Sequence, residues 1–510
     1  MVHDSHNLSA AAPTSSIPWY KQSHLLKLNY TIISMVLLAS ANGYDGSVMG
    51  GLLAFGTWNK FMNYPQGAYL GWISSIYWLG NGVSFPMAAW VSERFGRKRG
   101  IYVGFVLLAL GIGLQAGAQT EKMFTVSRLI VGFASAWLGN GPPLLINEVA
   151  YPTHRAVLSS AFMCGWYVGG TICGWATFAC RVIPSEWSWR IPVLLQCVLP
   201  LIALPGTIMA PESPRWLVSK GRISEATQII ADNHNGGDLE DPLVAFQMAE
   251  IEMAITLERE ASASASYADM VKTHGNRRRM IISISLGIFS QWCGNGVVSY
   301  YLPLVLSSVG LKTVTQQTLI SACLNVWNLF WAVAAALNVD RLGRRPLFLA
   351  SGIIMLISYI IITGLSGSFA TTGSSSVGLA VVPFLFVFYA GYDLALTPLL
   401  TAYPCEVWQF SLRSRGLTLT WCTGVVAIFF NTFINAIALE AIGWKYYIVF
   451  IVIIVLYILT AFFAYPETRG RTLEQITTIF DEAEAQAMFD ATSKVSKQAR
   501  VEIEDQKMQA

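Results

Sequence analysis

Twelve apolar segments, each long enough to cross about 30 Å of hydrocarbon, limit the folds open to this chain more than any other feature. The first six cover 29–53, 68–91, 100–118, 123–146, 157–180 and 190–210, and the second six cover 280–308, 314–338, 346–367, 378–403, 414–439 and 445–465. Only 12% of the 510 residues are charged, against about 25% in a soluble domain. The sequence therefore predicts an all-α membrane protein with twelve transmembrane helices in two pseudo-symmetric six-helix bundles.

Basic residues in the short connections set the orientation, because cytosolic loops carry an excess of Lys and Arg. They gather after the second, eighth and tenth segments, as Arg94, Arg97, Lys98, Arg99, Arg341, Arg344, Arg345, Arg413 and Arg415. We therefore expect both termini and the central polar stretch in the cytosol. The predicted organisation is an N-terminal tail over 1–28, a first bundle over 29–210, a linker with short helices over 211–279, a second bundle over 280–465 and a C-terminal tail over 466–510.

Three short motifs occur once in each half of the chain, at matching positions. The pairs are Glu93–Lys98 with Asp340–Arg345, Glu148 and Arg155 with Glu406 and Arg413, and Pro211–Arg215 with Pro466–Gly470. Such repetition indicates two structurally equivalent halves. Two such halves around a site near the bilayer midplane form an alternating-access transporter.

The charged residues of these motifs are expected to hold the cytosolic ends of the bundles together when the site opens outward. They are Glu93, Arg97, Glu148, Arg155, Glu212 and Arg215 in the first half, and Asp340, Arg344, Glu406, Arg413, Glu467 and Arg469 in the second. The alternative is a solvated charge cluster that only sets the topology.

At these motifs the chain resembles the sugar porters of the major facilitator superfamily, over almost its whole length. Pro211–Leu217 and Pro466–Gly470 together are specific for that family. The runs Ser290–Tyr301, Trp166–Gly169 and Ile442–Tyr447 are similar to the fungal lactose and cellodextrin permease branch. The resemblance implies the major facilitator fold and proton-coupled uptake of a sugar, a disaccharide or a hexose, across the plasma membrane.

An acid and a base lie at similar depth in the first and fourth segments. Asp45 follows Lys27 by 18 residues, roughly 27 Å of helix, and Arg128 precedes Glu148 by 20 residues, roughly 30 Å. Pairing the two lowers the cost of burying each charge. We expect protonation of Asp45 to release Arg128 and favour reorientation, as the positions of the family's proton-coupling pair also imply; a static ion pair is the alternative.

The polar run inside segment 280–308 is expected to face the substrate. Its candidates are Gln291, Trp292, Asn295, Tyr300 and Tyr301, and Gly294, Gly296 and Pro303 predict a bend there. Amides and phenols can bind several sugar hydroxyls, and tryptophan rings can stack on pyranose faces. Further candidates elsewhere are Trp166, Asn328, Asn431 and Asn435. The alternatives are hydrogen bonds that only join helices and membership of an interfacial tryptophan belt.

Asp393 is an acid that this pattern does not explain. It lies 13 residues before Glu406, about 20 Å from the cytosolic end, and an acid inside the membrane is a functional candidate by default. Binding substrate, taking part in proton transfer and a purely structural place are all open. Asp393 and Met163, which stands where sugar porters usually have an amide, leave room for another small polar metabolite.

The sequence also argues against several classes of protein. It shows no nucleophile–base–acid arrangement, no metal cluster and no phosphate loop, so we expect neither an enzyme nor an ATP-driven pump, and no cofactor. A net charge of +3 does not suggest a nucleic-acid partner. The expected partners are a sugar, a proton and the lipid bilayer, with the chain as a monomer. A sugar receptor that does not transport stays open as an alternative.

Overall fold

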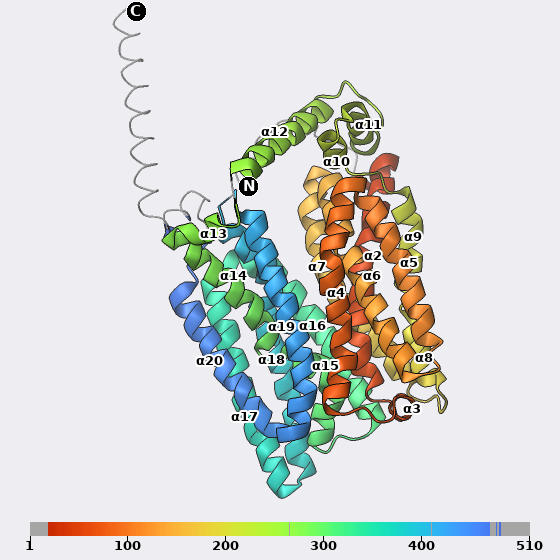
Figure 1. Ribbon diagram of the computed structural model, residues 1–510, viewed down its shortest axis with the longest axis vertical. Helices are drawn as coiled ribbons and strands as arrows, with labels where there is room; N and C mark the ends of the chain where they lie inside the picture. The colour runs from red at the N-terminus through yellow and green to blue at the C-terminus, as the bar shows by residue number, and fades with distance from the viewer. Residues whose placement is uncertain (1–18, 265, 410, 470–475, 477–478, 481–510) are drawn as a thin grey trace, which may run out of the picture.

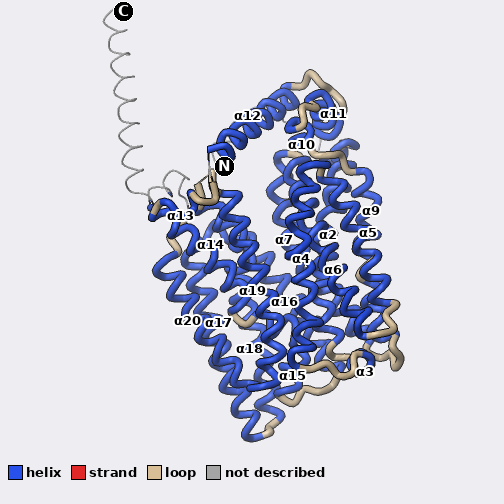
Figure 2. The backbone as a smooth tube through the Cα atoms, in the orientation of Figure 1, coloured by secondary structure: helices blue, strands red, loops and turns tan. Residues whose placement is uncertain are grey.

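The computed structural model describes residues 19–264, 266–409, 411–469, 476 and 479–480. The side chains of Met163 and Asp340, with those of a few other helical residues, lie outside the description. No strand occurs within these ranges, and helices joined by short loops make up most of the chain (Figure 2).

The helices divide into two bundles and a linker between them (Figure 1). The first bundle follows a short turn, η1 (Trp19–Lys21), and consists of α2 (Ser23–Leu52), α3 (Gly56–Phe61), α4 (Gly67–Phe95), α5 (Arg97–Ala116), α6 (Glu121–Val149), α7 (Pro152–Cys180), α8 (Trp187–Leu195) and α9 (Val198–Met209). The linker holds α10 (Pro214–Ser219), α11 (Ile223–His234), α12 (Pro242–Ser264) and α13 (Asp269–Lys272). The second bundle consists of α14 (His274–Trp292), α15 (Asn295–Ser308), α16 (Val314–Leu342), α17 (Arg344–Thr372), α18 (Ser375–Val407), α19 (Arg413–Ile442), η2 (Gly443–Tyr446) and α20 (Tyr447–Ala464).

Twelve of these helical stretches cross the membrane, as the sequence predicts. Nine described stretches are long and apolar enough by composition alone, and the last of them, Arg413–Ala464, contains both α19 and α20. The more polar α4 and α7 are 29 residues each and pack inside the same bundle, which completes the twelve. The pairs α8–α9 and α14–α15 each form one crossing.

The predicted single helices over 190–210 and 280–308 are both interrupted. The first breaks near Gln196 and Cys197, between α8 and α9. The second breaks at Gly294, which has a left-handed φ of 98°, and a further kink follows at Tyr301 just before Pro303. The predicted bend is thus confirmed, and the break lies between Gln291 in α14 and Asn295 in α15.

A seam of glycines joins α2 to α7. A Cβ on Gly169 would lie 1.8 Å from the carbonyl oxygen of Ser40, and one on Gly43 would lie 2.0 Å from that of Trp166. Only glycine lets two helix backbones approach this closely. The seam therefore fixes where the Trp166 ring lies: its Cη2 would be 2.6 Å from a Cβ on Gly46, the residue after Asp45.

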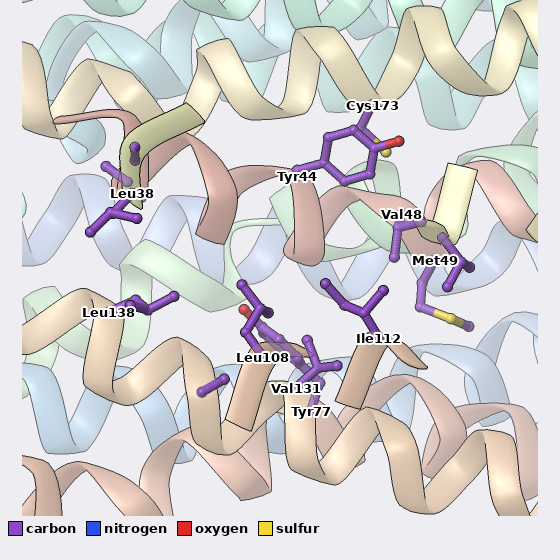
Figure 3. Close-up of a cluster of buried hydrophobic side chains, with 14 of the residues drawn as sticks. Leu38, Tyr44, Val48, Met49, Tyr77, Leu108, Ile112, Val131, Leu138 and Cys173 are labelled. Carbon is purple, nitrogen blue, oxygen red and sulfur yellow. The ribbon is translucent and has the colours of Figure 1, made fainter. Parts of the chain in front are cut away.

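An apolar core holds the other helices of the first bundle against α2. Figure 3 shows side chains that converge on it from five helices: Leu38, Tyr44, Val48 and Met49 from α2, Tyr77 from α4, Leu108 and Ile112 from α5, Val131 and Leu138 from α6, and Cys173 from α7. All ten are almost fully buried. The second bundle has its own core, and the core of the first also takes in Tyr301 and Ala436 of the second bundle.

The bundles meet through α4 with α19, α7 with α16 and α2 with α15. Backbone atoms of the two bundles approach closely at the end opposite α10–α12. A Cβ on Gly71 would lie 2.4 Å from the Phe433 carbonyl oxygen, and one on Gly50 would lie 2.8 Å from that of Ser299. Toward the end that carries α10–α12 the bundles diverge (Figure 1). In this conformer the two bundles are thus in closest contact at the end opposite the linker.

Two matching corners lie at the linker end, one in each bundle. Gly96 (φ 104°, ψ 159°) and Gly343 (φ 89°, ψ 154°) directly precede α5 and α17. Glu212 accepts hydrogen bonds from the backbone N–H of Arg97 at 3.0 Å and Lys98 at 3.4 Å. A carboxylate at a helix N-terminus satisfies donors that the helix leaves free and complements its dipole.

Glu467 performs the same task in the second bundle. It accepts from the N–H of Arg344 at 3.0 Å, Arg345 at 3.1 Å and Arg469 at 2.8 Å. Partial burial opposes ionisation of this carboxyl, but the backbone donors outweigh it, so the pKa of Glu467 lies below its ordinary value. The repeated motifs therefore correspond to a repeated structure.

Replacing Gly96 with alanine should lower the free energy of unfolding by about 1–3 kcal/mol, the cost of holding a residue with a Cβ in a region that is essentially glycine-only. The added Cβ would also lie 2.5 Å from Glu212 Oε2. Thermal unfolding in detergent measures the change. Gly221→Ala is the matched control, because Gly221 has a φ of 77° with nothing within 4 Å; an equal loss there would show that contact with Glu212 adds nothing.

The linker packs against one end of the first bundle (Figure 1), and two of its polar contacts are hydrogen bonds to backbone carbonyl groups there. The indole Nε1 of Trp216 donates to the Glu93 carbonyl oxygen at 2.8 Å. His234 in α11 is buried, and its Nε2 lies 3.0 Å from the carbonyl oxygen of Val149 at the end of α6. The linker is thus attached to the first bundle directly.

Candidate functional site

Asp45 on α2 and Arg128 on α6 lie side by side inside the first bundle. Their exposed fractions are 0% and 2%. One guanidinium nitrogen, Nη1, donates to the Asp45 backbone carbonyl at 3.2 Å, while both carboxyl oxygens and Arg128 Nε lack a hydrogen-bond partner. The expected depth match is therefore observed, but in this conformer the base contacts the acid's backbone rather than its carboxyl group.

Aromatic rings of α4 surround this pair and were not singled out from the sequence. The Arg128 guanidinium carbon lies 4.8 Å from the centroid of the Tyr77 ring, a cation–π contact. The Tyr77 hydroxyl donates to Ser135 Oγ at 2.8 Å, which fixes the ring. The signal available in the sequence was an adjacent Tyr77–Trp78 pair in a membrane helix, and it does not by itself distinguish a site from packing.

Trp78, which packs on the neighbouring Tyr77 ring, contacts aromatic rings of both bundles. Its ring centroid lies 6.2 Å from that of Trp166 on α7 and 6.3 Å from that of Tyr300 on α15. All three rings are partly exposed. The trio therefore places aromatic faces from both bundles together, next to the segment of α2 that carries Asp45.

Several predicted sugar ligands are occupied by protein groups here. Asn431 donates its amide to the Gln291 carbonyl oxygen, Tyr446 donates to Asn435 Oδ1 at 2.8 Å, and Tyr301 donates to the Thr432 carbonyl oxygen at 2.6 Å. All three contacts hold α14, α15 or η2 against α19. In this conformer Asn431, Asn435 and Tyr301 join helices, the alternative stated for such residues.

The remaining candidates keep free hydrogen-bonding capacity. The side-chain oxygens of Asn295 and Asn328 are buried and have no partner. Gln291 is partly exposed. The Trp292 ring is 37% exposed while its Nε1 donates to the Ala427 carbonyl oxygen at 3.0 Å.

Asp393 on α18 is fully buried and bonded within the protein. Its Oδ1 accepts from the hydroxyls of Tyr167 at 2.5 Å and Thr397 at 2.8 Å. Its Oδ2 is buried without a hydrogen-bond partner. Tyr167, which belongs to the first bundle, was not singled out from the sequence because 226 residues separate it from Asp393.

The charged loop residues form ion pairs within each bundle. Arg97 pairs with Glu148 through two contacts of 3.0 Å. Arg344 pairs with Glu406 at 2.7 Å. Arg155 interacts electrostatically with Glu250 of the linker, and Glu93 is exposed. Arg215 and Arg413 are also engaged, while Asp340 lies outside the described side chains.

Among the described residues, no three His, Cys, Asp or Glu side chains are grouped so that they could hold a metal ion. The buried polar groups of the site include amides, phenols, two separate acids and the Arg128 guanidinium. Such groups bind hydroxyl-bearing solutes and protons.

Comparison with known proteins identifies the family. The family described as "Sugar (and other) transporter" matches residues 31–480. The chain is 29% identical over 443 residues to the MFS-type transporter oryC of Aspergillus oryzae, covering 85% of this chain and 82% of that protein. It is 26% identical over 453 residues to a high-affinity glucose transporter of Kluyveromyces lactis, covering 85% and 81%.

A solved structure shares the fold. The partially occluded, inward-open xylose transporter XylE of E. coli superposes with a TM-score of 0.72 at 21% identity, covering 88% of this chain and all of that one. This supports the major facilitator fold. The match over residues 31–480 and the twelve-helix architecture together show that the chain is a multi-pass membrane transporter rather than an enzyme, and that it belongs to the sugar porter family of the major facilitator superfamily.

Proposed function

We propose that the protein moves a sugar, a disaccharide or a hexose, across the membrane together with a proton, by alternating access. The observation that carries this proposal is the buried contact of Arg128 with Asp45, in which the carboxyl group has no hydrogen-bond partner. A relative is described as a high-affinity glucose transporter, and a solved neighbour as a proton:xylose symporter.

The coupling step follows from the charges. Ionised Asp45 attracts Arg128 and holds α2 to α6, because an opposite charge lowers the cost of burying each group. A proton on the carboxyl group removes that attraction and leaves Arg128 to Tyr77 and the Asp45 carbonyl. The contacts between α2, α6 and the aromatic trio then differ between the two protonation states, which is what biases a two-state transporter.

The sugar is proposed to bind between the aromatic trio and the second bundle. Trp78 and Trp166 offer ring faces, while Gln291, Asn295, Asn328 and Tyr300 offer donors and acceptors for hydroxyl groups. Asn431, Asn435 and Tyr301 become available only if the helix contacts described above change. Trp292 can contribute a ring face.

The proposal also covers the oligomeric state of the protein and its orientation in the membrane. We propose a monomer in the plasma membrane with both termini and the linker in the cytosol, and with the bundles and tails bounded as the sequence predicts. The loop charges are proposed to join the bundles when the site opens outward. In the present conformer the pairs Arg97–Glu148 and Arg344–Glu406 each lie inside one bundle.

Uptake of a panel of radiolabelled sugars by a transport-deficient yeast, with and without a protonophore, tests the proposal. We expect concentrative uptake of at least one mono- or disaccharide, reduced to simple equilibration by the protonophore. Absence of uptake for every carbohydrate would refute the sugar assignment. Uptake that the protonophore leaves unchanged would refute proton coupling alone.

A second candidate is transport of another small polar metabolite. It is favoured by the amide nitrogen of Asn431 and the side-chain oxygen of Asn435, which are already bonded within the protein and leave fewer groups for a sugar. Competition of the labelled substrate by a panel of polar non-carbohydrate metabolites separates the two candidates.

A further inference from the structure

A hydrogen bond from Tyr167 to the carboxyl group of Asp393 joins the two bundles. Tyr167 belongs to α7 of the first bundle, and Asp393 and Thr397 belong to α18 of the second. The three hydroxyl and carboxyl oxygens form a triangle, because Tyr167 and Thr397 also lie 2.9 Å apart. Outside this triangle α7 packs along α16 rather than along α18.

Within the triangle, only one of the two carboxyl oxygens of Asp393 accepts hydrogen bonds. Oδ1 takes both hydroxyl donors, while Oδ2 is buried and has none. Hydrogen bonds to an ionised carboxylate are roughly twice as strong as those to a neutral group. The strength of the contact between the bundles therefore depends on the charge of this carboxyl group.

Asp393 is the acid of this cluster, and the groups around it are hydroxyls and phenols, which ionise only at higher pH. The phenols that the charge of Asp393 affects are Tyr167 on α7 and Tyr389 and Tyr392 on α18, and phenols ordinarily ionise near pH 10. No charged side chain contributes among the described residues that act on Asp393. The described charges on the neighbouring helices α7, α14, α16, α17 and α19 lie toward the helix ends.

We propose that Asp393 is a proton-binding acid of the second bundle, separate from Asp45, and that Tyr167 of the first bundle responds to its charge. A proton from water binds at Oδ2 and returns to water from the same atom, with no other bond made or broken. While ionised, the carboxylate holds Tyr167 and stabilises the present conformer. Once neutral, it binds Tyr167 more weakly, and the bundles part more easily at this level.

This inference stands apart from the role proposed for Asp45. A transporter with both acids has two charges that change during its cycle, one in each bundle. The second of them acts directly on the interface between the bundles, whereas Asp45 and Arg128 both lie in the first bundle. The two can therefore be separated experimentally.

Electron spin distance measurements on the purified full-length protein test the proposal. Spin labels carried by non-canonical amino acids at the exposed positions Arg99 and Arg341 report the separation of the bundles at the linker end, and leave the eight native cysteines unlabelled. We expect the most populated distance of the otherwise wild-type protein to shift between pH 8 and pH 5. Asp393→Asn should move the pH 8 distribution toward that of pH 5 and so reduce the shift, and Tyr167→Phe should reduce it as well.

Three further variants decide the outcome: Tyr403→Phe, Asp45→Asn, and Asp45→Asn combined with Asp393→Asn. Tyr403→Phe is the matched control, since that hydroxyl lies on the same helix but bonds to the Pro466 carbonyl oxygen at 2.8 Å within the second bundle; its shift should equal the wild-type shift. In an Asp45→Asn background a pH-dependent shift should remain and should disappear on adding Asp393→Asn. If Asp45 has no coupling role, Asp45→Asn alone behaves as wild type while Asp393→Asn still loses the response.

The full wild-type shift in Asp393→Asn would overturn the proposal. Should that variant not fold, the full wild-type shift in Tyr167→Phe, which removes one hydroxyl group, would overturn it equally. Loss of the shift in Tyr403→Phe would also count against it, because any buried tyrosine hydroxyl would then have the same effect.

Discussion

Replacing Asp45 with asparagine should abolish accumulation of the transported sugar while exchange of sugar across the membrane continues. Asparagine has nearly the same shape but cannot change its charge, so the contact with Arg128 no longer depends on pH. For one proton per sugar, a gradient of one pH unit supports about tenfold accumulation. In proteoliposomes we expect this ratio to fall to equal concentrations inside and outside, with counterflow retained.

The control for this variant lies one turn away on the same helix. Asn42 is nearly buried, and its amide donates to the Ser135 carbonyl oxygen at 3.3 Å, so Asn42→Ser removes a polar contact without touching a charge. It should retain accumulation. Asp45→Asn that still accumulates sugar to the wild-type ratio would contradict the proposed role.

Replacing Gly169 with alanine should prevent the first bundle from packing. The new Cβ would lie 1.8 Å from the Ser40 carbonyl oxygen and 2.7 Å from the Tyr44 backbone nitrogen. Neither backbone atom can move away unless α2 separates from α7, so we expect a cost at or above the roughly 1–3 kcal/mol typical of an overpacked core. Size-exclusion chromatography of the solubilised protein should show loss of the monodisperse peak.

Gly113→Ala on α5 is the matched comparison for Gly169→Ala. It makes the same chemical change inside a helix, but nothing lies within 4 Å of the new atom. Alanine is favoured over glycine in a helix by about 1 kcal/mol, so this variant should be neutral or slightly more stable. A Gly169→Ala protein as stable as Gly113→Ala would mean that the two helices are not in the contact described here.

Much of the fold could be predicted because it depends on local properties of the chain. Segment length and hydropathy predict the twelve crossings, and the repeated motifs predict the paired corners that Glu212 and Glu467 complete. The break at Gly294 follows from glycine's freedom at positive φ. The break between α8 and α9 was missed, although Pro200 has no N–H to donate to the Gln196 carbonyl group four residues earlier.

The candidate site could be predicted only in part. The depth of a residue in the membrane follows from counting residues along its helix, but the neighbours of its side chain depend on how the helix is rotated about its axis. A rise of 1.5 Å per residue correctly matched the levels of Asp45 and Arg128. It does not say which atoms meet, so the contact with the Asp45 backbone was not foreseen. The partners of Asp393 and Asn431 lie 226 and 140 residues away, and those pairings depend on how whole bundles are oriented.

The duplicated corners at Gly96 and Gly343 provide the chain with an internal reference. The same substitution can be made in either copy, and only the Gly96 copy lies beside Trp216 and the linker. Twin variants therefore share their local chemistry and differ in what surrounds them. The difference between their effects measures how much the contacts with the linker add to the stability of the first corner.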